Sequence, residues 1–170
     1  TDIALLHPIE SAWVRFTPSR HWVAEASPDA HRIERVFHDA EENLFRSRRD
    51  FTHVDSRTLA EATVANGVLE FGALRWRIVI LPDADTLPLA AWENLERFYQ
   101  SGGVVVALTS KPANSDSEFP SRCVLELGAA LFGDGTRASI TTNAAGGAGI
   151  FLPAGTEGIL PTCSTDRKST

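Results

Sequence analysis

The chain has 170 residues, with 16 basic against 22 acidic side chains and a formal net charge of −6. Hydrophobic residues make up 43% of it and charged residues 22%, a balance typical of a globular protein with one buried core. The acidic balance argues against binding to the phosphate backbone of nucleic acid. No apolar run approaches the roughly 20 residues that a membrane-spanning helix needs. We therefore expect neither nucleic acid nor a membrane among the partners.

Strand-like and helix-like patterns alternate along the chain. Continuous apolar runs such as IALLH and RWRIVILPD predict strands that are buried on both faces, whereas apolar residues three and four apart predict amphipathic helices. Strands are expected at 3–7, 51–55, 75–83, 104–110, 138–142 and 148–153. Helices are expected at 29–48, 59–62, 86–103 and 124–132, with a loop over 8–22.

Local signals mark several of the boundaries between these elements. Ser27-Pro28 is a helix start with proline in the first turn, and Asp55 is placed to cap the short helix that follows it. Asn66-Gly67 stands between two β-type runs, which predicts a two-residue hairpin. The glycine-rich stretch NAAGGAG is expected to join the last two strands as a pair.

This alternation predicts an α/β protein with a mainly parallel sheet. Five main strands suit a flavodoxin-like, three-layer α/β/α fold with a five-stranded sheet plus an added β-hairpin. Residues 1–160 are expected to form this single domain, and 161–170 a polar tail. The abrupt start at a strand and the polar end lead us to expect a fragment of a larger protein.

Polar residues follow the carboxyl ends of the expected strands, which is where sheets of this kind carry their chemistry. His7 comes after the first strand, Asp55 after the second, Asp83 after the third and Ser110 after the fourth. The candidate ligand or interface cluster at these ends consists of His7, Glu10, Ser11, Trp13, Asp83 and Ser110.

These residues match none of four familiar enzyme sites. A serine hydrolase presents its nucleophile on a tight elbow, but a long polar loop follows Ser110. A phosphoacceptor site needs an acidic pair after the first strand, and a nucleotide site needs a glycine-rich turn there, whereas this chain has His7. A glycosidase needs two facing carboxylates, and nothing in the spacing forces Glu10 together with Asp83 or Asp55, the pairings that the sequence offers. We expect no metal, no cofactor and no catalytic residue.

The remaining histidines, cysteines and tryptophans are expected to be structural. Cys123 lies in an apolar helical pattern that predicts a buried, inert thiol, and its pairing with Cys163 is left open. Core burial is favoured over surface packing or sugar stacking for the tryptophans Trp13, Trp22 and Trp76. Solvated or structural positions are expected for the histidines His21, His31, His38 and His53.

Three stretches together resemble a known family: ALLHPIESAW at 4–13, the block from DFTHVD to LTSKP at 50–112, and GGAGIFLP at 146–153. The combination is similar to the class I glutamine-amidotransferase-like domain within large bacterial glycoside hydrolases. The α-L-rhamnosidase type is the most similar, and the trimerisation domain of some β-galactosidases is more distant. The resemblance implies a flavodoxin-like fold and an exported, polysaccharide-degrading bacterial parent.

The chain departs from the amidotransferase pattern at the catalytic strand. Active members of that family carry a cysteine nucleophile on an elbow and a later His-Glu pair, whereas VVVALTSKP offers Thr109 and Ser110, and the last segment has no H-x-E. The resemblance therefore implies a non-catalytic accessory domain that contacts the other domains of its parent, supports homo-oligomer contacts or shapes the substrate cleft. Two alternatives stay open: a carbohydrate-binding module, and a small hydrolase or sugar-active enzyme that uses His7, Glu10, Asp83 and Ser110.

Overall fold

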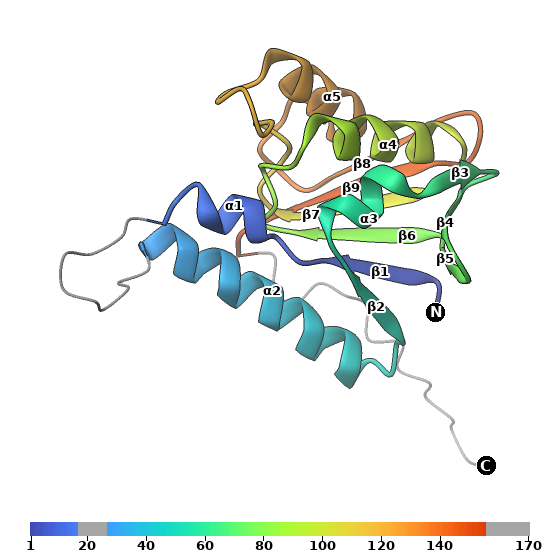
Figure 1. Ribbon diagram of the computed structural model, residues 1–170, viewed down its shortest axis with the longest axis horizontal. Coiled ribbons are helices and arrows are strands. Elements are labelled where there is room, and N and C mark those ends of the chain that lie inside the picture. Colours follow the sequence, from blue (N-terminus) through green and yellow to red (C-terminus); the bar gives the residue numbers. More distant parts are fainter. Residues whose placement is uncertain (17–26, 156–170) are drawn as a thin grey trace, which may run out of the picture.

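The computed structural model describes residues 1–16 and 27–155, and its centre is a six-stranded mixed sheet (Figure 1). The strands lie across the sheet in the order β2-β1-β6-β7-β9-β8. Their bounds are β1 Ile3–Leu6, β2 Phe51–Val54, β6 Ile78–Pro82, β7 Val104–Thr109, β8 Ser139–Thr142 and β9 Ala148–Pro153. All pair in parallel except β8, which runs antiparallel to β9 at one edge. Taken in chain order, the parallel strands follow the flavodoxin-like arrangement 2-1-3-4-5, so the α/β prediction is confirmed.

Helices lie on both faces of this sheet. Among the described residues, one face is covered by α2 (Pro28–Arg46), and a short α1 (Ile9–Trp13) precedes it at the end of β1 (Figure 1). The other face is covered by α3 (Ser56–Glu61), α4 (Leu89–Gln100) and α5 (Arg122–Phe132) (Figure 1). This three-layer arrangement buries both faces of the central strands, as a parallel sheet requires.

The main core lies between the sheet and α4. Val79 and Val105 on neighbouring strands and Trp92 and Phe98 on α4 are all fully buried in one cluster. On the opposite face, a smaller cluster contains Leu5 together with Phe37 and Ala40 of α2. Alternate strand residues thus point to opposite layers, which is the pattern that the continuous apolar runs anticipated.

A second, three-stranded antiparallel sheet is formed by β3 (Thr63–Ala65), β4 (Val68–Phe71) and β5 (Leu74–Trp76). The hairpin at Asn66-Gly67 is confirmed, with φ of 50° and 71° at its two central residues. The single strand predicted over 75–83 is wrong, because the chain divides at Arg77 between the two sheets. Trp76 pairs with β4, whereas β6 pairs with β1. A run of β-type residues does not reveal which sheet each part joins.

The long helix predicted after Ser27 is confirmed as α2, and the Ser27 hydroxyl accepts a hydrogen bond from the amide of Ala30 at 3.2 Å. The loop predicted over 8–22 is wrong in its first part, because α1 begins at Ile9. With five residues, α1 is too short to show a helical repeat of apolar positions. No described helix is long and apolar enough to cross a membrane. The predicted tail, 161–170, lies outside the described residues.

Candidate functional site

The crevice between the carboxyl ends of β1 and β6 is where strand order reverses, and open α/β sheets bind their ligands there. In this chain α1 fills that place. Ser11 of α1 is fully buried, and its hydroxyl donates to the carbonyl oxygen of Thr86 at 3.2 Å and accepts from the amide of Thr86 at 3.0 Å. One side chain therefore satisfies both backbone groups of a buried residue beyond β6.

An ion pair closes the same crevice from outside. Arg15 donates from Nη1 and Nη2 to the two carboxylate oxygens of Asp85 at 3.1 and 2.5 Å, and Nη1 also donates to the carbonyl oxygen of Ser11 at 2.8 Å. The hydroxyl of Thr86 donates to Asp85 at 2.9 Å. These bonds join the segment around α1 to the segment after β6. Both carboxylate oxygens of Asp85 accept hydrogen bonds in this arrangement.

Asp83 and Ser110, at the ends of β6 and β7, do come together as the sequence suggested. Ser110 donates its hydroxyl proton to Oδ1 of Asp83 at 2.5 Å, and Arg32 of α2 donates from Nε to Oδ2 at 2.8 Å. Asp83 is only 1% exposed, so Arg32 compensates a buried charge. The hydrogen bond with Asp83 is the main cause that raises the pKa of Arg32.

The backbone around this pair is bent. Asp83 has φ of 50° and Thr109 has φ of 69°, both in the left-handed region that side chains with a Cβ seldom adopt. A serine nucleophile needs a neighbouring base that receives its proton. Among the described residues, Ser110 has a hydrogen bond from its side chain only to Asp83, whose second oxygen is held by Arg32. The hydrogen bond between Ser110 and Asp83 therefore joins the ends of β7 and β6 as a structural contact.

Lys111 is also used structurally. Its Nζ donates to the carbonyl oxygens of Gly133 and Gly135, each at 2.5 Å, and lies 4.7 Å from the ring centroid of Phe151. These contacts hold the loop after α5 against β9. The ammonium group thus satisfies carbonyl groups beyond a helix end, where positive charge is favourable.

Glu10 and Asp83 have different hydrogen-bond partners. The Oε1 atom of Glu10 accepts a hydrogen bond from the hydroxyl of Ser56 on α3, and its Oε2 is buried without a hydrogen-bond partner among residues 1–16 and 27–155. His7 is exposed and has its ring 5.0 Å from that of Phe37. The six residues of the predicted cluster are therefore divided between the closed crevice and separate contacts, and they do not form one site.

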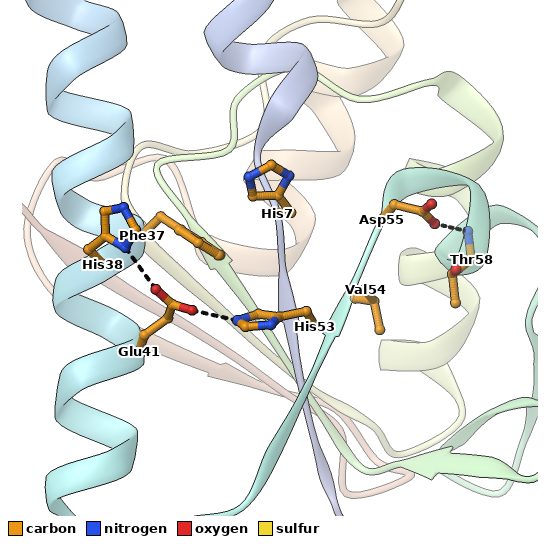
Figure 2. Close-up of a pocket in the computed structure, with 8 residues that line it drawn as sticks. All are labelled: His7, Phe37, His38, Glu41, His53, Val54, Asp55 and Thr58. Carbon is orange, nitrogen blue, oxygen red and sulfur yellow. Dashed lines mark hydrogen bonds and ion pairs between the residues drawn. The ribbon is translucent and has the colours of Figure 1, made fainter.

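A pocket of about 500 Å³ opens beside the crevice, between α2, β2 and the start of α3 (Figure 2). The ring of Phe37 lines this pocket, and three imidazoles lie around that ring at centroid distances of 5.0 to 5.5 Å. Glu41 lies between two of them: its Oε2 contacts His38 Nδ1 at 2.8 Å, and its Oε1 contacts His53 Nε2 at 2.7 Å (Figure 2). The third imidazole belongs to His7.

Asp55 and Thr58 form the far side of this pocket (Figure 2). Asp55 caps α3 by accepting from the amide of Thr58 at 2.7 Å. Hydrogen bonds from the side chain and then the amide of Thr58 lower the pKa of the Asp55 carboxyl below its ordinary value, because they favour its ionised form.

A second depression of about 290 Å³ continues toward α1 and shares His7, Phe37 and His38 with the first. It includes Trp13 and Phe16, whose side chains are 70% and 45% exposed. We call the two depressions together the edge groove. Its residues were missed at the sequence level, apart from His7, Trp13 and Asp55, because Phe37 and Glu41 belong to a helix face and His53 to an edge strand.

Two expectations about single side chains are corrected here. Cys123 is exposed on α5, since it lies one position before the buried Val124 on the helix; its pairing with Cys163 lies outside the described residues. Trp76 is fully buried, in agreement with the expectation for tryptophan, whereas Trp13 is exposed.

Among the described residues, no group of three or more histidine, cysteine, aspartate or glutamate side chains is arranged to hold a metal ion. No family model matches the chain, and no curated protein gives a significant sequence match. The fold class is thus an α/β protein with a flavodoxin-like order of parallel strands, and its site must be argued from its own residues.

Proposed function

We propose that this chain is a non-catalytic, amidotransferase-like accessory domain of a bacterial glycoside hydrolase of the α-L-rhamnosidase type. Its role is to pack against the other domains of an exported parent protein, to support subunit contacts and to shape the substrate cleft. The assignment to that family comes from the sequence resemblance at 4–13, 50–112 and 146–153.

The observation that carries the non-catalytic role is the closed crevice between β1 and β6. Ser11 of α1 and Arg15, which follows that helix, occupy the position where a ligand would lie in an open α/β sheet, and both are bonded to the segment 85–86. A substrate could reach this position only after these buried bonds were broken. A fold with its usual site filled is suited to a supporting role.

The bonding of Ser110 supports the same role. At the strand end where an amidotransferase-like enzyme has its nucleophile, this hydroxyl is bonded to a buried carboxylate that Arg32 already neutralises. Catalysis by a hydroxyl needs a base that can accept its proton and an oxyanion site beside it. Among the described residues, Glu10 bonds to Ser56 and His7 packs on Phe37, so neither of them is bonded to Ser110.

The test is a turnover assay with the purified chain and its Ser110→Ala variant. We expect no hydrolysis of glutamine or of aryl glycosides, including the aryl α-L-rhamnoside, above the rate of the variant. Turnover by the wild-type chain that disappears in Ser110→Ala or in Glu10→Gln would overturn the accessory role and favour the enzyme alternative. Circular dichroism spectra of both variants serve as the control for folding.

A further inference from the structure

The edge groove also lies at the carboxyl ends of strands, near His7 after β1 and Asp55 after β2. Unlike the crevice between β1 and β6, it is not filled by α1. Its two depressions share three residues and measure about 500 and 290 Å³, of the order of small-molecule sites, which are roughly 300–1,000 Å³. Such sites combine apolar walls with a few polar groups that fix orientation. The edge groove has both parts, at opposite ends.

The end near α1 is aromatic. Trp13 is 70% exposed although an indole buries a large apolar area in most folds, and Phe16 beside it is 45% exposed. Neither residue belongs to the two core clusters. An exposed, flat aromatic surface at the rim of a groove is suited to contact with the apolar face of a ring-shaped ligand.

The other end offers hydrogen bonds in both directions (Figure 2). The imidazole of His7 has one nitrogen that donates and one that accepts in its neutral form, and its ring has no hydrogen bond within the part of the chain that the structure describes. The Asp55 carboxylate is held by Thr58, whose amide donates to Oδ1 at 2.7 Å and whose side chain also hydrogen-bonds to it. A ligand that is rich in hydroxyl groups can both donate to and accept from the imidazole of His7.

The charges around the groove select against an anion. Glu34 and Glu41 of α2 and Asp55 line it, and neither lysine nor arginine is among the residues that line its described part. Glu41 already has both oxygens bonded to His38 and His53. A phosphate or a carboxylate would meet these carboxylates without a lysine or arginine to pair with, and two of the three imidazoles already contact Glu41.

We infer that the edge groove binds a neutral sugar ring, which stacks on Trp13 and exchanges hydrogen bonds with His7, a residue that lines the same depression. The inference rests on the proposed function for its choice of sugar, because an accessory domain of a glycoside hydrolase is exposed to saccharides. The position and lining of the edge groove do not depend on the proposed function. The bound sugar would lie beside the crevice that α1 fills, so binding requires no change at Ser11.

The test follows the indole N–H resonance of Trp13 in the ¹⁵N-labelled chain, assigned with Trp13→Phe. Methyl α-L-rhamnopyranoside and methyl β-D-galactopyranoside are the neutral probes, and D-glucosamine and D-glucuronate are the cationic and anionic ones. We expect a saturable shift with at least one neutral glycoside and weaker binding of glucuronate. The absence of saturable shifts with both neutral glycosides would overturn the inference, as would tighter, salt-sensitive binding of glucosamine, which would identify a cation site.

Variants locate the binding. Trp13→Ala should weaken the neutral glycoside by about tenfold, the scale of a lost aromatic contact, and His7→Ala should weaken it as well. Ile140→Ala is the matched control, since Ile140 is a 71% exposed apolar side chain on β8, outside the groove. Equal affinity of Trp13→Ala and wild type would contradict the inference. Loss of sugar binding leaves the turnover test untouched, so this failure is distinguishable from that of the proposed function.

Discussion

The Ser11 hydroxyl and the backbone of Thr86 form a reciprocal pair, in which one oxygen donates to the carbonyl group and accepts from the amide of the same residue. Ser11 is fully buried and Thr86 is 1% exposed, so water does not replace either bond. This pair connects the helix after β1 to the segment after β6. It explains why a short polar sequence after the first strand builds structure in the place where a related fold would bind a ligand.

Ser11→Ala should reduce the free energy of unfolding by about 1–3 kcal/mol, because it leaves a buried amide and a buried carbonyl without their partner. Urea denaturation followed by circular dichroism measures the change. Ser117→Ala is the control, since Ser117 is exposed, and a change within about 0.5 kcal/mol is expected there. A Ser11→Ala variant as stable as the control would show that the pair contributes nothing.

Arg32→Ala should destabilise the chain by about 2 kcal/mol, because the buried carboxylate of Asp83 loses its compensating charge. The expected loss is below that of a fully buried pair, since the Arg32 side chain is 35% exposed. Arg35→Ala provides the comparison on the same helix: Arg35 is exposed, and its variant should remain near wild type in urea denaturation. Equal stability of the two variants would contradict the importance of this ion pair.

The succession of strands and helices along the chain could be predicted because the signals for it are local. Apolar runs such as VVVALT mark buried strands, Ser27-Pro28 marks the start of α2, and Asn66-Gly67 forces a hairpin. The division at Arg77 could not be predicted in this way, since Trp76 and Ile78 have equally β-type side chains. Their sheets are decided by pairing: Trp76 pairs with Leu69 on the preceding strand, whereas Ile78 pairs with Ile3 at the start of the chain.

The candidate site was predicted only in part, for a related reason. The rule that polar residues gather at strand carboxyl ends correctly placed Asp83 beside Ser110. The bonds that decide what these residues do involve partners far along the chain, such as Arg32, which is 51 residues from Asp83. Helix and edge-strand residues such as Glu41 and His53 give no comparable signal in sequence.

Asp55 should give the stability a dependence on acid pH. The folded-state pKa of this carboxyl lies below the unfolded value of 3.8, because Thr58 donates to its ionised form. Its contribution is therefore fully present above the unfolded pKa and is lost as pH falls through the lower folded pKa. Asp55→Ala should cost about 1 kcal/mol at neutral pH by removing the cap of α3, and the difference from wild type should shrink below pH 3.8. Asp55→Asn, which keeps a capping oxygen, should lose less at neutral pH; a constant difference across the acid range would contradict this account.

Asn94 on α4 provides the sharpest test of how the two helices on one face are joined. Its Nδ2 donates to the carbonyl oxygens of Leu59 and Ala62 at 2.6 and 2.8 Å, and the side chain is buried. Both carbonyl groups lie at the end of α3, where helix carbonyls lack partners of their own. The amide group of Asn94 thus satisfies two acceptors at once.

Asn94→Asp keeps the shape of the side chain and removes both donors, so a buried carboxylate would face two carbonyl oxygens. We expect a loss of at least about 3 kcal/mol in the free energy of unfolding, the combined cost of unpaired acceptors and a buried charge. Asn43→Asp, the same substitution at an exposed position near the end of α2, should cost about 1 kcal/mol or less through the helix dipole. Urea denaturation of both variants at neutral pH measures the difference. A small loss in Asn94→Asp would mean that α3 and α4 are held by their apolar contacts, with the amide bridge contributing little.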